Sequence, residues 1–353
     1  MSGFVDWDLA GRVAEKAAGG GPAVMPGLDL GAIGGRAERA VLAYTRLRVE
    51  EPIPAAEWVS RREWTALNLV SMRELVGPVE ARLVGNLPGA GRDAMAAVIG
   101  RMLAAEIGLL LGVASKRILG QYDFSMAGVE RRPRLVFVGE SIEEAAGKLG
   151  GGRGEVLEWV ALHEGTHAAH FAAAPWLRTH LGALTEELLA GASLHSSPQE
   201  ILARARGVAT SDPRRALAAL RESDPLTLLA TEASRATIAE VQAAMAAIEG
   251  YAEHVRDAAA GEIGDVVPQL RAGLERRRQT RSPLVRMLSW LLGFELKLRQ
   301  YRDGKRFADG VVERGGIDGL NLAWADAASL PSLDELHDPG GWIRRIRPAA
   351  APV

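Results

Sequence analysis

Apolar residues recur at helical spacing along almost the whole chain, with polar residues between them. A repeat of three and four residues is typical of amphipathic helices, whereas strict alternation indicates strands. The sequence therefore predicts a mainly α protein with few short strands. Helices are expected over residues 36–49, 55–76, 93–111, 142–149, 156–172, 177–192, 198–205, 213–219, 237–259, 266–278 and 283–314.

One short segment departs from this pattern. Residues 134–138 read Arg-Leu-Val-Phe-Val and are bounded by Pro133 and Gly139. Such β-prone runs between breaking residues are typical of strands. The segment 19–35 is rich in glycine and proline, which predicts a loop.

Composition narrows the class of protein. The chain has 353 residues, of which 48% are hydrophobic, and its formal net charge is −2. A neutral balance does not favour a nucleic-acid or anionic-membrane partner. The absence of cysteine excludes disulfides and any cysteine-ligated metal site. We expect a helical region at 1–125 and a catalytic region at 126–353, packed as one compact unit.

No targeting or spanning segment is evident. The N-terminus lacks a basic stretch followed by an apolar run, which secretory signals require. The most apolar stretches, 104–114 and 284–298, fall short of the roughly 18 uncharged residues of a membrane helix. We therefore expect a soluble, cytoplasmic protein.

The chemistry of the chain is concentrated in His163-Glu-Gly-Thr-His167, which has the pattern H-E-x-x-H. Residues four apart share one face of a helix, so His163 and His167 can direct two imidazoles at one zinc ion. Glu164 lies about 100° around the helix, where it can act as a general base. The alternative is an amphipathic helix that carries these residues by chance.

A catalytic zinc needs a third protein ligand. Glu249, Glu253 and Asp257 follow one another at spacings of four and form an acidic stripe on a predicted helix. We assign Glu249 as the third ligand, with Glu253 as the acid that hydrogen-bonds to a ligand histidine and Asp257 in support. A solvated acidic face is the alternative. His254 is a lower-ranked ligand, because it sits about 140° around the helix from Glu249.

His170 follows the motif closely. The metzincin pattern continues with glycine at position 170 and histidine at 173, but the chain has His170 and Ala173, so that subclass is excluded. His170 is expected to support the metal ligands or to pack in the core.

The residues resemble a known bacterial, largely actinobacterial, family of zincin-like proteins. Its members are usually labelled zinc-dependent metalloproteases, or hydrolases associated with deazaflavin coenzyme biosynthesis. The resemblance covers most of the chain and is strongest from Arg134 to Arg345. It implies a helical zincin-like fold with two histidines and a downstream glutamate as zinc ligands. The matching segments are 159–167, 248–255 and 291–307.

Together these features predict a zinc-dependent hydrolase, a metallopeptidase of glutamate-zincin type that acts on a peptide or a small amide. Tyr251, His254 and Tyr301 are candidate donors to the developing oxyanion. The predicted strand 134–138 either pairs with an extended peptide or lies in the core. The alternative function is a catalytically silent zinc-bearing scaffold or binding protein, in which Glu164 would be dispensable.

Overall fold

The structure is a computed structural model that describes residues 4–19, 27–85, 92–123, 131–149, 152–191, 232–263, 267–279 and 294–347. Within these ranges helices dominate and three short strands form one sheet, which confirms the mainly α prediction. The elements are α1 (Trp7–Ala18), α2 (Leu30–Thr45), β1 (Ala56–Val59), α3 (Arg61–Gly85), α4 (Arg92–Ser115), β2 (Gly120–Asp123), β3 (Arg134–Val138), α5 (Gly139–Leu149), α6 (Arg153–Ala173), α7 (Trp176–Gly191), α11 (Glu232–Ala259), η1 (Ala260–Ile263), α12 (Val267–Gln279), α14 (Phe294–Asn321), η2 (Leu322–Trp324), η3 (Ala327–Ser329), η4 (Glu335–His337) and α15 (Pro339–Ile346).

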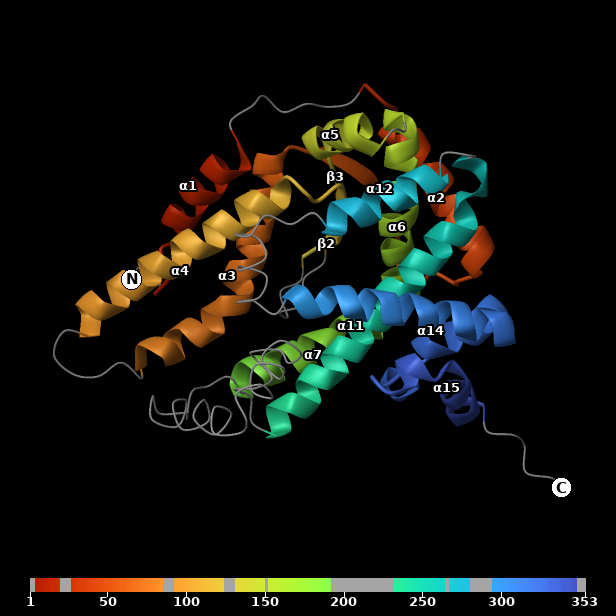
Figure 1. Ribbon diagram of the computed structural model, residues 1–353. Helices are drawn as coiled ribbons and strands as arrows, with labels where there is room; N and C mark the ends of the chain where they lie inside the picture. Colours follow the sequence, from red (N-terminus) through yellow and green to blue (C-terminus); the bar gives the residue numbers. More distant parts are fainter. Residues whose placement is uncertain are drawn as a thin grey trace, which may run out of the picture.

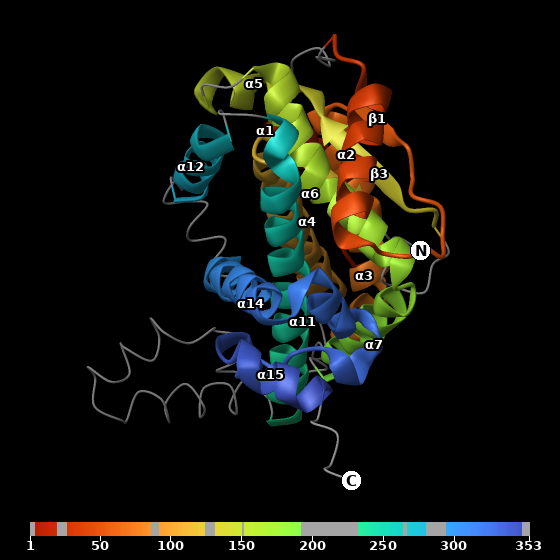
Figure 2. The same ribbon diagram turned by 90° about the vertical axis from the view of Figure 1, so that its right-hand side faces the viewer.

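Helix α6 occupies the middle of the molecule. Figure 1 shows α1, α3 and α4 grouped on one side and α14 and α15 on the other, with α6 and α11 between them. Helix α6 packs against α2, α11 and strand β2, and α11 runs beside it in both views (Figure 2). The main hydrophobic core surrounds α6, which buries apolar side chains such as Trp159, Leu157 and Phe171. A side chain that points from α6 toward α11 is therefore shielded from solvent by the surrounding core.

The sheet has the order β1-β3-β2. The central strand β3 pairs in parallel with β1 and antiparallel with β2. Its residues Val136, Phe137 and Val138 are fully buried. Because both edges of β3 are occupied, the prediction that it pairs with an extended peptide is wrong, and it is a core strand. The sheet draws strands from both sides of residue 125, and the division of the chain at that residue stays a prediction.

Two predicted boundaries are wrong. Ala56–Val59, expected to be helical, forms β1, and helix α3 begins only at Arg61. The cause is a capping box at Ser60 and Glu63, in which each backbone N–H donates to the other residue's side chain. The expected loop 19–35 is also too long, because α2 already begins at Leu30.

Several elements have no counterpart in the expected pattern. These are helix α1, strand β2 and helix α15. The expected helices 198–205 and 213–219 lie outside the described residues, and the expected helix 283–314 is described only from residue 294, as α14.

Helices α11 and α14 cross at very close range. A Cβ atom on Gly250 would lie 2.1 Å from the carbonyl carbon of Gly304, and one on Gly304 would lie 1.9 Å from the carbonyl oxygen of Ala246. Only glycine permits this contact between the two backbones. The crossing fixes the backbone of α11 at Gly250, the residue after Glu249. Helix α14 therefore helps to hold Glu249 in position.

Helix α4 is an exception to the expectation that no segment is long and apolar enough to span a membrane. Within the described residues, Ala96–Ser115 is long and apolar enough to do so by length and composition alone. One such helix is weak evidence, and a glycine face of α4 packs closely against α1 at Gly108 and Gly112. The cytoplasmic location stays a prediction.

Candidate metal centre

Helix α6 presents the two motif histidines on one face. It begins after Gly152, whose backbone N–H donates to the Glu155 carboxylate in a capping interaction. The imidazole rings of His163 and His167 lie one turn apart, with centroids separated by 4.8 Å and planes inclined by 83°. Their side chains are only 16% and 11% exposed. The local spacing thus places two nitrogen ligands in a mostly enclosed space.

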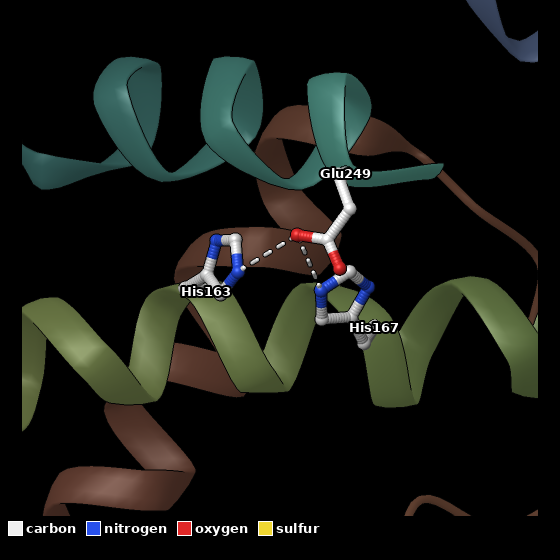
Figure 3. Close-up of side chains that lie close together, drawn as sticks. All are labelled: His163, His167 and Glu249. Carbon is white, nitrogen blue, oxygen red and sulfur yellow. Dashed lines mark ion pairs between the residues drawn. The ribbon is translucent and has the colours of Figure 1, made fainter. Parts of the chain in front are cut away.

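Glu249 reaches the two histidines from the neighbouring helix α11, as Figure 3 shows. Its Oε2 atom lies 3.6 Å from Nε2 of His163 and 3.8 Å from Nε2 of His167. All three ligand atoms lie within 4.8 Å of one another. Tetrahedral zinc with ligand distances of 2.0–2.2 Å separates its donors by about 3.4 Å. The two nitrogens and one carboxylate oxygen therefore fit zinc in chemistry and in spacing.

The charges of the three groups support one another. Burial alone would raise the pKa of Glu249, but attraction to the two imidazoles outweighs it and lowers that pKa well below the usual range. Burial alone would lower the pKa of His167, but the Glu249 carboxylate outweighs it and raises that pKa. Glu249 is thus ionised at neutral pH, which is the state that a carboxylate needs to bind a cation.

We expect the Glu249→Ala variant to bind zinc about 10²–10³-fold more weakly than the wild type. Zinc bound by four ligands gains about 10–16 kcal/mol, so one ligand is worth about 2.5–4 kcal/mol. Competition with a chelator of known affinity measures the loss. Glu240→Ala is the matched control, since Glu240 lies on the same helix with a 54% exposed side chain. Undiminished affinity in Glu249→Ala would mean that the third ligand lies elsewhere.

Glu164 directly follows the candidate ligand His163 in sequence but makes a different contact. Its Oε2 atom accepts a hydrogen bond of 3.0 Å from the backbone N–H of Tyr122 in β2. Residues 119–123 were not predicted to contribute to the site. A glycine followed two residues later by a tyrosine is too weak a sequence signal to reveal a strand at the edge of a metal site.

The acidic stripe on α11 does not act as one group. Glu253 is buried, and Nδ1 of His163 has no hydrogen-bond partner, so Glu253 does not donate to or accept from that atom. Asp257 lies near cations instead, with Arg256 at 3.0 Å and Arg271 at 2.9 Å. Glu249 is the acid of this stripe that lies in the candidate ligand group with His163 and His167.

The candidate oxyanion donors are engaged elsewhere. The buried Tyr251 hydroxyl donates to Oδ1 of Asn321 at 2.8 Å. Both ring nitrogens of His254 are occupied at 2.7 Å, by the Tyr44 hydroxyl and by an oxygen of Asp309. The side chain of Tyr301 lies outside the described residues.

His170 is buried in an aromatic cage rather than at the metal ligands. Its ring centroid lies 3.9 Å from that of Trp324 and 5.1 Å from that of Tyr251. Neither ring nitrogen has a hydrogen-bond partner. Burial lowers the pKa of His170 to about 3, with a smaller contribution from His167. The side chain is therefore neutral and packs in the core.

A family model and a solved structure both match nearly the whole chain. The model of a family described as "Zincin-like metallopeptidase" matches residues 5–343. A solved structure from Chloroflexus aurantiacus, described as a candidate hydrolase with a novel fold, is similar over 98% of this chain and 100% of that chain. The two share 28% sequence identity with a TM-score of 0.70. No curated protein matches the chain significantly.

Proposed function

Because the chain belongs to the zincin-like metallopeptidase family, we propose that it is a zinc-dependent hydrolase that cleaves amide bonds in peptides. The observation that carries this proposal is the meeting of two imidazole nitrogens from α6 with one carboxylate oxygen from α11. Three protein ligands leave a fourth position open, as catalytic zinc sites require. A glutamate as third ligand favours the glutamate-zincin subtype.

The chain's own residues supply binding and proton transfer. His163, His167 and Glu249 would hold the zinc, which, when bound, activates water and polarises the substrate carbonyl. Glu164 accepts a proton from the attacking water and then donates it to the departing amine. The Tyr122 N–H holds one oxygen of Glu164, so the carboxylate is oriented before the substrate arrives.

The open edge of β2 supports a peptide as the substrate. Val138 donates to the carbonyl of Leu119, so residues 119 and 121 of this antiparallel ladder face β3. The backbone groups of Gly120 and Tyr122 consequently face away from β3; the Tyr122 N–H among them already donates to Glu164, which leaves the N–H of Gly120 and the two carbonyls for a peptide. Within the described residues no strand pairs with this edge. An extended peptide can add to such an edge through main-chain hydrogen bonds.

Removal of the metal tests the proposal. We expect treatment with a chelator to abolish hydrolysis of a mixed peptide library, and one equivalent of zinc per chain to restore it. Cleavage is read by mass spectrometry of the library, and bound zinc by elemental analysis of the same samples. Magnesium is the control ion, because it prefers six oxygen ligands over imidazole. Cleavage that persists in chelator-treated protein would contradict the proposal.

A further inference from the structure

Strand β2 lies unusually close to the motif helix, and Gly120 is the residue at the contact. A Cβ atom at this position would lie 2.9 Å from Cγ of Glu164 and 3.0 Å from Cγ1 of Val160. It would also lie 3.2 Å from Cδ1 of Phe137. Real Cβ contacts are essentially never shorter than 3.0 Å, so any side chain at position 120 forces its surroundings to move.

The neighbours of Gly120 differ in how far they can move. Phe137 is fully buried in the central strand, and Val160 is buried on α6. Packed cores resist such shifts. Glu164, by contrast, meets Gly120 through a flexible side chain. A methyl group at position 120 would therefore displace the Glu164 side chain, and this movement breaks the hydrogen bond from the Tyr122 N–H.

We propose that Gly120 is a positioning residue for Glu164. Its missing side chain leaves the path along which the Glu164 side chain passes under β2 and reaches the Tyr122 N–H at the outer edge. The inference rests on the proposed function, in which Glu164 moves the proton. A base that transfers protons must be held close to its productive geometry, because a displacement of about 1 Å costs roughly 100-fold in rate.

The contact is local to one face of β2. Gly120 and Tyr122 share the face toward α6, whereas Gln121 points to the opposite face and accepts a hydrogen bond of 2.7 Å from the Trp64 indole. A change at residue 121 consequently disturbs the strand without touching Glu164. Gln121→Ala is therefore the matched control for Gly120→Ala.

Amide hydrogen exchange tests the contact in the zinc-loaded protein. In Gly120→Ala we expect the Tyr122 amide to exchange as fast as in Glu164→Ala, which lacks the acceptor. The Val138 amide, which donates to Leu119 at 2.9 Å, reports on the sheet and should exchange at the wild-type rate. The proposal is wrong if the Tyr122 amide of Gly120→Ala stays as protected as in the wild type. It is also wrong if the Val138 amide of Gly120→Ala exchanges as fast as its Tyr122 amide, because the glycine then serves only the packing of the strand.

Kinetics test the consequence. We expect Gly120→Ala to lower kcat about 10–100-fold, with KM and bound zinc near wild-type values, and Gln121→Ala to retain most of the activity. Wild-type kcat in Gly120→Ala, with Glu164→Gln inactive, would overturn this inference alone. Wild-type turnover by Glu164→Gln would instead overturn the proposed function and, with it, the catalytic role of the contact.

Discussion

The Glu164→Gln variant should hydrolyse peptides about 10³–10⁴-fold more slowly than the wild type while it retains one zinc per chain. Proton transfer by a positioned side chain contributes about 10²–10⁴-fold, and Glu164 serves in two successive transfers. Glutamine has nearly the same shape and can still accept the hydrogen bond from the Tyr122 N–H. It cannot take up a proton, so the substitution removes the chemistry and leaves the packing.

The measurement is kcat/KM on a cleaved peptide, together with the zinc content of the same preparation. Glu158→Gln is the matched control, since Glu158 lies on the same helix and pairs with Arg36 at 3.2 Å. Equal turnover by Glu164→Gln and the wild type would favour the zinc-bearing scaffold, in which Glu164 is dispensable. Loss of zinc from the variant would show that Glu164 also holds the site together.

Replacing His170 with phenylalanine should make the fold markedly more resistant to acid. The folded-state pKa of His170 is lowered from the ordinary 6.5 to about 3 by burial. The unfolded chain therefore binds a proton below about pH 6.5, while the folded chain does not. The stability that this neutral histidine contributes is complete above about pH 6.5 and is lost as the pH falls toward 3.

The expected loss of unfolding free energy follows from the pH interval between the pKa of His170 in the unfolded chain and its pKa in the folded chain. Each pH unit within it costs about 1.4 kcal/mol, so from about pH 6.5 to about pH 4.5 the wild type loses about 3 kcal/mol of unfolding free energy through this group. Urea denaturation of zinc-free protein at both pH values measures the loss. Phenylalanine keeps an aromatic ring at this position and cannot be protonated, so the variant should lack this part of the loss.

A second histidine serves as the control. His337 lies on η4 with a 60% exposed side chain, so His337→Leu should retain the acid sensitivity of the wild type. If His170→Phe loses as much free energy between the two pH values as the wild type does, the buried ring is not the source of the acid sensitivity.

The helical part of the fold was largely readable from the chain. Periodicity predicted α6 and α11 to within about five residues, although α6 is buried on nearly all sides rather than along one face. Periodicity failed where pairing partners decide the structure. The residues of β1 were assigned to a helix, and β2 was missed, because strands of four residues exist only through their hydrogen bonds to β3.

The candidate site likewise has one part that the sequence predicted and one part that it did not. The spacing of His163 and His167 is a property of one helix, and Glu249 was singled out because the motif demanded a third ligand. The companion acids at positions 253 and 257 share its spacing, yet neither reaches the imidazole pair as a hydrogen-bond partner of Nδ1 of His163 or as a metal ligand. Which residue of a periodic stripe faces a neighbouring helix depends on the crossing of the two helices, which sequence spacing does not specify.

The sequence by itself predicted the candidate ligand types, the two-histidine face and the candidate general base, since these follow from local spacing along the chain, and the family resemblance followed from segments spread over the chain. Only the tertiary structure decided that Glu249 meets the histidines, that Tyr251 and His254 are committed to Asn321, Tyr44 and Asp309, and that β2 holds Glu164. The physical reason is that the residues in contact lie far apart in the sequence. About 80 residues lie between the second histidine and Glu249, and about 40 lie between Gly120 and Glu164. Contacts over such distances are created by packing and hydrogen bonding between elements, and no local pattern records them.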